Sequence, residues 1–207
     1  MKKFLLVLSI ILLTFGCKRV DSIIFKEDFE KENYNTKIKV NIPSDNPMTY
    51  ITEEDLIKKI ENKEDIIVLF GYSKSLETRS MIENLISISK NNNINKIYYL
   101  DILEIRDEKI IDNNEVKTTK NGTEDYNKLL ELLKDNLNDY IINNQNVGKR
   151  IYSGTLLKIS NKNISIIRGI SDNFDINNYN DDMKKESYDK INNFLNNNSL
   201  CSPNEGC

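Results

Sequence analysis

Apolar residues along the first half of the chain alternate between two spacings. Helical spacing over about 52–63 and again over 76–90 predicts two amphipathic helices, the first opened by the capping hydroxyl of Thr52. Between the two predicted helices, 66–70 is an unbroken apolar run rich in β-branched residues. After the second helix, 96–102 is another largely apolar segment. Such runs are typical of strands that are buried on both faces. The order helix, strand, helix, strand therefore predicts a parallel pair of strands joined by a right-handed crossover.

The second half of the chain predicts antiparallel structure. A polar stretch over 104–121 precedes an amphipathic helix that opens at Gly122, so we expect a helical insertion over about 104–150. The short apolar segments 155–159 and 164–167 flank a polar turn and predict a β-hairpin. A last amphipathic helix is expected over about 182–196. The fold class expected from both halves is α/β, with a central mixed sheet flanked by helices.

The segment that precedes the first predicted helix shows little periodicity. Residues 18–46 are polar and charged, with prolines and a turn cluster near the end. We therefore expect residues 17–50 to form a tether outside the folded domain. Within this tether, residues 37–42 alternate between polar and apolar side chains and predict one edge strand.

The first 16 residues resemble the signal peptide of a bacterial lipoprotein. Two lysines precede a ten-residue apolar stretch, 4–13, which is too short to span a bilayer as a mature helix. The stretch leads to Gly16 and Cys17, and the resemblance implies that Cys17 is acylated and becomes the new N-terminus. A plain secretory signal with an incidental thiol is the alternative. The lipoprotein reading implies an extracytoplasmic protein that the lipid on Cys17 anchors to a bacterial membrane.

The composition of the chain excludes several classes of function. Its 207 residues include 29 basic and 32 acidic side chains, a net charge of −3, so we expect no nucleic-acid partner. Histidine is absent, which rules out Ser-His-Asp and Cys-His catalysis and histidine-ligated zinc. Apolar residues make up 39% of the chain, a share that suits a globular protein better than a disordered one. We expect neither a metal nor a cofactor.

Four segments together resemble a known family, the thioredoxin-like lipoproteins, and in particular the bacteriocin-transport-accessory type of thioredoxin-fold protein from low-GC bacteria. They match the region of the redox motif, the strand after it, the inserted helix, and the region of the cis-proline and hairpin, and are 66–79, 97–102, 122–133 and 149–169. The resemblance implies a thioredoxin-like domain over about 51–200. It also implies that the inserted helix precedes the C-terminal β-hairpin.

The resemblance places the two redox-active cysteines of the family on Ser75 and Thr78. The redox chemistry needs a thiolate of low pKa at a helix N-terminus and a second thiol that resolves the mixed disulfide. A hydroxyl supplies neither group, so we expect no catalytic residue at these positions. Ser75 is instead a suitable helix N-cap, and Glu77 in the first turn complements the helix dipole.

The cis-proline of the family is also missing. Gly154 and Thr155 stand where the family has proline and threonine. A cis peptide bond before a residue other than proline costs about 2.5–4 kcal/mol, so we expect the bond between Ser153 and Gly154 to be trans. The family presents its substrates in a groove beside these positions, and that groove is where the resemblance implies binding.

The remaining thiols, Cys201 and Cys207, bracket the short C-terminal tail, 201–207. No cysteine occurs between residues 18 and 200. An even pair in an oxidising compartment favours a disulfide, which would close a local loop after the last helix. The alternative is a relay pair that takes part in thiol exchange. The negative end of a helix dipole raises the pKa of a thiol, which disfavours high reactivity at this place.

Two functions from different classes follow. The first is a membrane-anchored extracytoplasmic module of thioredoxin-like fold that is redox-inactive at the usual site. Such a module, which is not an enzyme, would bind an exported protein or peptide, or an envelope complex. The second is a thiol-disulfide oxidoreductase that uses Cys201 and Cys207, or the thiols of a partner.

Overall fold

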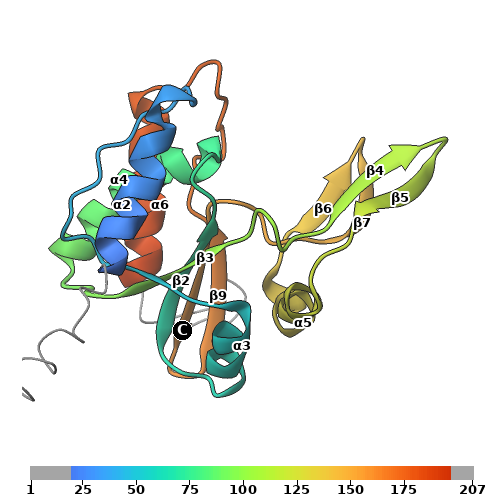
Figure 1. The fold of residues 1–207 in the computed structure, drawn as a ribbon, viewed down its shortest axis with the longest axis horizontal. Helices are drawn as coiled ribbons and strands as arrows, with labels where there is room; N and C mark the ends of the chain where they lie inside the picture. The colour runs from blue at the N-terminus through green and yellow to red at the C-terminus, as the bar shows by residue number, and fades with distance from the viewer. Residues whose placement is uncertain (1–19, 197–207) are drawn as a thin grey trace, which may run out of the picture.

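The computed structural model describes residues 20–196, which form a five-stranded mixed sheet with helices on both faces and an arm on one side (Figure 1). The strand order is β1-β3-β2-β8-β9. The first three strands in this order run parallel, and β8 and β9 continue the sheet in antiparallel pairs. The strands are β1 (Met48–Tyr50), β3 (Ile97–Asp101), β2 (Ile66–Gly71), β8 (Thr155–Ser160) and β9 (Asn163–Arg168).

The parallel half of the sheet is built as the hydrophobic pattern predicts. Helix α3 (Glu53–Glu61) leads into β2, and α4 (Leu76–Asn91) connects β2 to its parallel neighbour β3. Side-chain oxygens cap both helices, because Thr52 accepts from the backbone N–H of Asp55 and Ser75 accepts from that of Thr78. The expected strand–helix–strand unit is therefore confirmed.

The antiparallel half closes the domain with a hairpin and a helix. Strands β8 and β9 pair around a two-residue turn, Asn161–Lys162, in which both residues have positive φ. Such turns match the twist of the strands that they join. Helix α6 (Asp181–Asn196) then packs against α4. The expected hairpin and last helix are confirmed.

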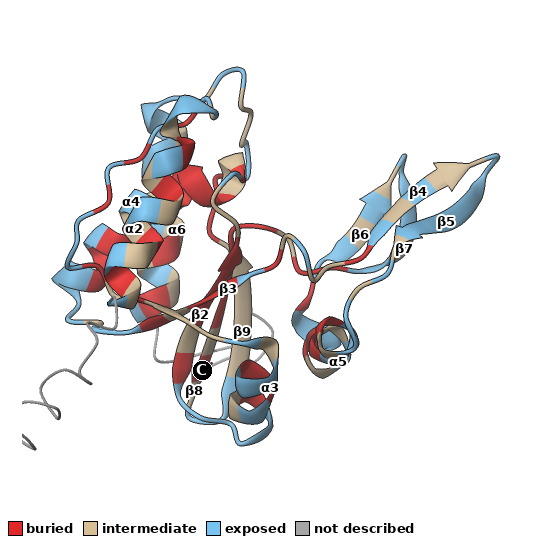
Figure 2. Cartoon of the chain, in the orientation of Figure 1, coloured by how far each residue is buried: buried red, intermediate tan, exposed pale blue. Residues whose placement is uncertain are grey.

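Alternation along the central strands creates two separate cores. Leu69 of β2 points to the face covered by α2, α4 and α6, whereas Val68 and Phe70 point to the face covered by α3 and α5. The buried residues accordingly lie between the sheet and its helices (Figure 2). The α/β class and the mixed sheet flanked by helices are therefore confirmed.

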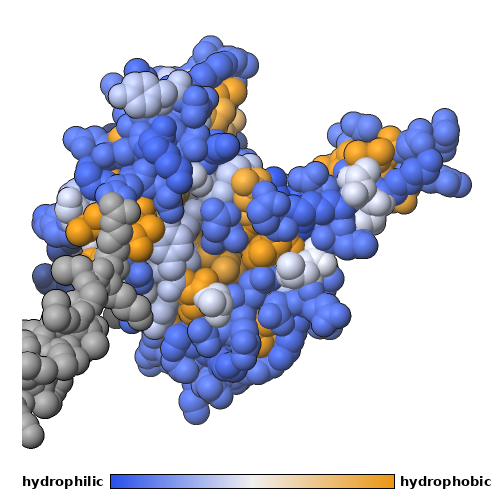
Figure 3. Space-filling model, in the orientation of Figure 1, coloured by the Kyte–Doolittle hydropathy of each residue, from blue (hydrophilic) through white to orange (hydrophobic). Residues whose placement is uncertain are grey.

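The region 104–150 contains more than the inserted helix. Helix α5 (Glu124–Leu133), followed by a 3-10 turn η2 (Lys134–Asn136), covers the sheet, but two hairpins project from it as an arm (Figures 1 and 3). Their turns, Asn113–Asn114 and Asn143–Asn144, have positive φ at both residues. The hairpin strands are β4 (Glu108–Asp112), β5 (Glu115–Lys120), β6 (Asp139–Ile142) and β7 (Gln145–Lys149).

The tether predicted for residues 17–50 is wrong for the part that the structure describes. Helix α2 (Asp21–Glu30) and the 3-10 turn η1 (Lys31–Tyr34) pack onto the sheet and bury Phe25 and Phe29 completely. The two rings stack at 4.4 Å, and Phe25 meets the ring of Tyr99 edge-on at 4.9 Å. Burial of two aromatic side chains outweighs the polar composition of this segment.

The edge strand predicted over 37–42 is also wrong. Ile38, Val40 and Ile42 are buried, as the alternation indicates, but this segment forms no strand. Side chains, and not a neighbouring strand, accept hydrogen bonds from its backbone N–H groups. The N–H of Val40 donates to Asn33 Oδ1, and the N–H of Ile42 donates to Glu30 Oε1. A neighbouring strand is therefore not needed to hold this extended segment.

The described residues include no helix that is both long and apolar enough to cross a membrane. The signal peptide over 1–16 and the acylation site at Cys17 lie outside the described residues. These two predictions therefore stay predictions.

The packing of α2 is tested by replacing Phe29 with alanine. Phe29→Ala removes a buried ring and leaves a cavity, so it should lower the free energy of unfolding by about 3–5 kcal/mol. Tyr34 is 95% exposed and only five residues away, so Tyr34→Ala is the matched control, with a change within about 0.5 kcal/mol. Urea unfolding of both variants measures the difference. Equal stability of the two would mean that residues 20–50 behave as a tether after all.

Candidate functional site

Three buried hydroxyl groups meet where the strand β2 leads into α4. Ser153 Oγ donates to Ser75 Oγ at 2.6 Å, and Thr78 Oγ1 lies 2.6 Å from Ser153 Oγ. Ser75 Oγ also accepts from the backbone N–H of Thr78 at 3.2 Å. Because the proton of Ser153 goes to Ser75, the hydroxyl of Thr78 must donate to Ser153. The three side chains form a hydrogen-bonded chain within the protein, called the hydroxyl network below.

Gly71 makes room for the hydroxyl network, and Gly154 gives the facing loop its backbone conformation. A Cβ on Gly71 would lie 2.4 Å from Thr78 Oγ1, so no larger residue fits there without displacing the network. Gly154 has a φ of +79°, which L-amino acids with a side chain rarely adopt. Its N–H donates to the carbonyl of Phe70 at 2.9 Å, and Thr155 then pairs with Phe70 as β8 begins. The loop 153–155 is thus held against the end of β2.

The structure brings together all four positions that the family resemblance singles out. Ser75 and Thr78 lie at the start of α4, and Gly154 and Thr155 follow Ser153 directly in the facing loop. Residues 20–196 contain no cis peptide bond, so the bond between Ser153 and Gly154 is trans, as expected. Ser153 belongs to the loop beside which the resemblance implies binding, but the hydrogen bond that connects it to α4 is evident only from the structure. Cys201 and Cys207 lie outside the described residues.

The hydroxyl network caps helix α4 and holds the loop 153–155 against the start of that helix. Ser75 caps α4, and its hydroxyl hydrogen-bonds to another hydroxyl, which is too weak a base to activate a nucleophile at neutral pH. No thiol lies among residues 20–196, so this part of the chain has no redox couple at the start of α4. Within the same residues no group of three or more histidine, cysteine or acidic side chains is placed to hold a metal ion. The network is therefore a structural feature of the start of α4.

Charged and aromatic side chains form a rim beside the hydroxyl network. Arg168 at the end of β9 pairs with Glu77 in the first turn of α4 at 2.5 Å, and it also donates to the carbonyl of Ser153 at 3.4 Å. The Arg168 guanidinium lies 4.8 Å from the centre of the Tyr152 ring. Sequence reasoning did not single out Arg168 or Tyr152, although both fall in the segment 149–169 that carries the resemblance.

Arg79, in the first turn of α4, is buried in the interior of the protein. It is 1% exposed, and its guanidinium donates to the carbonyl oxygens of Ile38, Phe29 and Ser73 at 2.5, 2.8 and 2.9 Å, and to Asn33 Oδ1. Burial lowers the pKa of Arg79, and the negative charges of Glu32 and Glu83 partly oppose that shift. With its donors taken up by the protein itself, Arg79 has a structural role.

Comparison with protein-family models, with curated protein sequences and with solved structures gives no match to this chain. The function therefore has to be argued from the residues and the geometry of the site.

A double-mutant cycle tests the hydroxyl network. Ser153→Ala leaves the hydroxyls of Ser75 and Thr78 without their shared partner, and Thr78→Val removes the donor to Ser153. Each single change should cost about 1–3 kcal/mol of unfolding free energy, because it leaves a buried polar group unsatisfied. The double variant should lose clearly less than the sum of the two, since Thr78→Val also removes a hydroxyl that Ser153→Ala leaves unpaired. Additive losses in urea unfolding would show that the two hydroxyls do not interact.

Proposed function

We propose that this chain has a thioredoxin-like fold and serves as a membrane-anchored extracytoplasmic binding module without redox activity at the start of α4. The order of the elements supports the fold. A parallel half, β1-β3-β2, precedes an antiparallel hairpin, β8-β9, and a final helix, α6, which is the order that the family resemblance implies. Only residues 72–75 separate the end of β2 from the start of α4, where the family carries its redox motif.

The observation that carries the proposal is the hydroxyl network. Ser75 and Thr78 occupy the places of the two redox cysteines, and their hydroxyls are joined through Ser153 in a buried network. Hydroxyl groups neither form disulfides nor exchange electrons, so the module retains the position of the site without its chemistry. The surface beside this position can still hold a ligand.

The rim of the network suits binding. Arginine and tyrosine are the side chains that contribute most to binding energy at protein interfaces, because they combine a large apolar surface with hydrogen-bonding groups. Arg168 and Tyr152 stack on each other here, directly over the loop that contains Ser153. The ligand proposed is an exported protein or peptide that meets the domain at this rim. Acylation of Cys17 would hold the module at the membrane while it binds.

Selection from a phage-displayed library of random peptides against the full-length protein tests the binding function. Peptides enriched on the protein should bind the Tyr152→Ala variant at least about tenfold more weakly, because the substitution removes a stacked ring from the rim. Tyr34→Ala, at an exposed position on the N-terminal segment, should leave the dissociation constants unchanged. Fluorescence anisotropy with the resynthesised peptides gives these constants. A selection that enriches no peptide, or peptides that bind Tyr152→Ala as well as the unmodified protein, would contradict the proposal.

The same preparation distinguishes the redox alternative. The binding module should not accelerate the reduction of insulin disulfides by dithiothreitol. Acceleration that the Cys201→Ser/Cys207→Ser double variant abolishes would instead favour an oxidoreductase that uses the C-terminal thiols.

The anchor is tested by metabolic labelling with radioactive palmitate in a bacterium that expresses the full chain. The unmodified protein should incorporate label, and Cys17→Ser should abolish the incorporation, because its hydroxyl does not accept the lipid in place of the thiol. Cys201→Ser is the matched control and should retain the label. An unlabelled, secreted wild-type protein would show that residues 1–16 are a plain secretory signal.

A further inference from the structure

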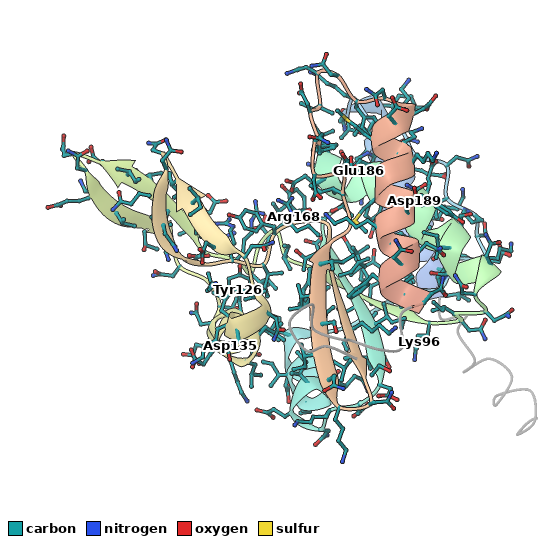
Figure 4. The ribbon with its side chains drawn as sticks, turned by 180° about the vertical axis from the view of Figure 1, so that it is seen from behind. Lys96, Tyr126, Asp135, Arg168, Glu186 and Asp189 are labelled. Atoms are coloured by element: carbon teal, nitrogen blue, oxygen red, sulfur yellow. The ribbon has the colours of Figure 1, made fainter. Side chains whose placement is uncertain are left out.

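The buried side-chain atoms without a hydrogen-bond partner gather in one region of the described chain, where the arm joins the sheet. Buried polar atoms are almost always hydrogen-bonded in native proteins, so such a gathering needs an explanation. Figure 4 shows Tyr126 at the base of the arm and Arg168 at the end of β9 that lies nearest to it. Within residues 20–196 the unpartnered atoms are Arg106 Nε, Asp107 Oδ1, Tyr126 Oη, Arg150 Nη1 and Arg168 Nε.

Three of these residues are arginines, and each of the three lies over a tyrosine ring. The guanidinium carbons of Arg106, Arg150 and Arg168 are 5.1, 4.1 and 4.8 Å from the ring centres of Tyr72, Tyr140 and Tyr152. The rings of Tyr140 and Tyr152 meet edge-on at 6.4 Å, which connects the pair on the arm to the pair on the sheet. These six side chains are called the arginine–tyrosine surface below.

The choice of arginine at this surface is selective. The chain has only five arginines among its 29 basic residues, and three of the five are here. A guanidinium stacks flat on an aromatic ring and presents parallel N–H groups to a carboxylate, which a lysine ammonium does not. Stacking fixes the plane of each guanidinium and so prepares its free N–H groups for an incoming acceptor.

Cationic hydrogen-bond donors outnumber carboxylate acceptors in this region. Lys109 joins the three arginines as a fourth cation, 3.4 Å from Asp107 and 5.9 Å from the centre of the Tyr140 ring. Within residues 20–196, Asp107 pairs with Lys109 and Arg150, and Glu77 pairs with Arg168. Asp107 Oδ1 is 4.0 Å from Arg150 Nη1, too far for a hydrogen bond, although Arg150 is only 6% exposed. The region therefore has spare donors and a positive charge.

We infer that the arginine–tyrosine surface binds an acidic, extended peptide segment, whose carboxylates accept hydrogen bonds from Arg106, Arg150 and Arg168. This inference rests on the proposed binding function and specifies its ligand. A peptide fits better than an inorganic anion because its apolar groups can also pack on the part-exposed rings of Tyr72, Tyr140 and Tyr152. Carboxylates spaced along an extended chain can reach guanidinium groups both on the arm and beside the sheet.

The experiment uses the peptides that the full-length protein selects from the random library. They should be enriched in aspartate and glutamate, and replacing each acidic residue with its amide should weaken binding by about tenfold. Affinity should also fall as the salt concentration rises from about 0.05 to about 0.5 M, because exposed charge pairs are screened. These measurements use the unmodified protein, so they do not depend on whether a variant folds.

Protein variants locate the ligand. Arg168→Gln and Arg106→Gln should each weaken binding of an acidic peptide about tenfold, and Arg168→Lys should restore only part of the loss. Lys90→Gln, near the far end of α4, removes an exposed positive charge from another place and should change nothing. Far-UV circular dichroism and urea unfolding confirm that each variant is folded.

The two proposals fail in different ways. Selected peptides that bind the Tyr152 rim without any preference for acidic residues would overturn the acidic ligand and leave the binding function standing. A selection that enriches nothing would count against the binding function itself. Binding to phosphatidylglycerol vesicles but to no acidic peptide would also overturn the inference, because it would assign the cations to a lipid surface.

Discussion

The hydrogen bonds of the buried Arg79 guanidinium are the interaction on which the arrangement of the N-terminal segment and the start of α4 depends. From its place in the first turns of α4, Arg79 donates to the carbonyls of Phe29 and Ile38 in the N-terminal segment and to that of Ser73 in the loop before the helix. A buried charge without an ion-pair partner is costly unless several dipoles solvate it. The carbonyl oxygens supply that solvation only when the N-terminal segment is in place, so the segment and the helix start stabilise each other.

This arrangement connects the N-terminal segment to the candidate site. The carbonyl of Ser73 is bound by Arg79, and two residues later Ser75 caps α4 and enters the hydroxyl network with Ser153. The same helix turn carries Glu77, whose ion pair with Arg168 holds the end of β9. The N-terminal segment, the start of α4 and the loop 153–155 therefore form one continuous set of polar contacts above the sheet.

The hydrophobic pattern predicted the parts of the fold that are buried on a regular period. Strand β2 and helix α4 could be predicted because nearly every apolar side chain in them is buried in a core. Helix α2 was missed because only Phe25 and Phe29, four residues apart, mark its buried side among many charges. A pair of phenylalanines at helical spacing was the signal available.

The hydrophobic pattern of the sequence could not predict the arm or the arginine–tyrosine surface, for a different reason. Strands β4 to β7 are largely exposed, so no alternation marks them, and only the Asn-Asn pairs at 113–114 and 143–144 suggested tight turns. The stacked pairs join residues that are distant along the chain, such as Tyr72 and Arg106. Spacing within a sequence carries no information about contacts of that kind.

The two polar features of this region differ in a way that bears on function. The hydroxyl network uses its hydrogen bonds internally, so folding alone accounts for its residues. The arginine–tyrosine surface keeps buried donor atoms that have no hydrogen-bond partner within residues 20–196, and an unpaired buried donor lowers stability. Groups that destabilise the free protein and would gain their partners on binding are what a preorganised recognition site requires. Under the proposed function, the arginines with unpaired donors, and not the hydroxyls of the network, are therefore the residues that should carry binding.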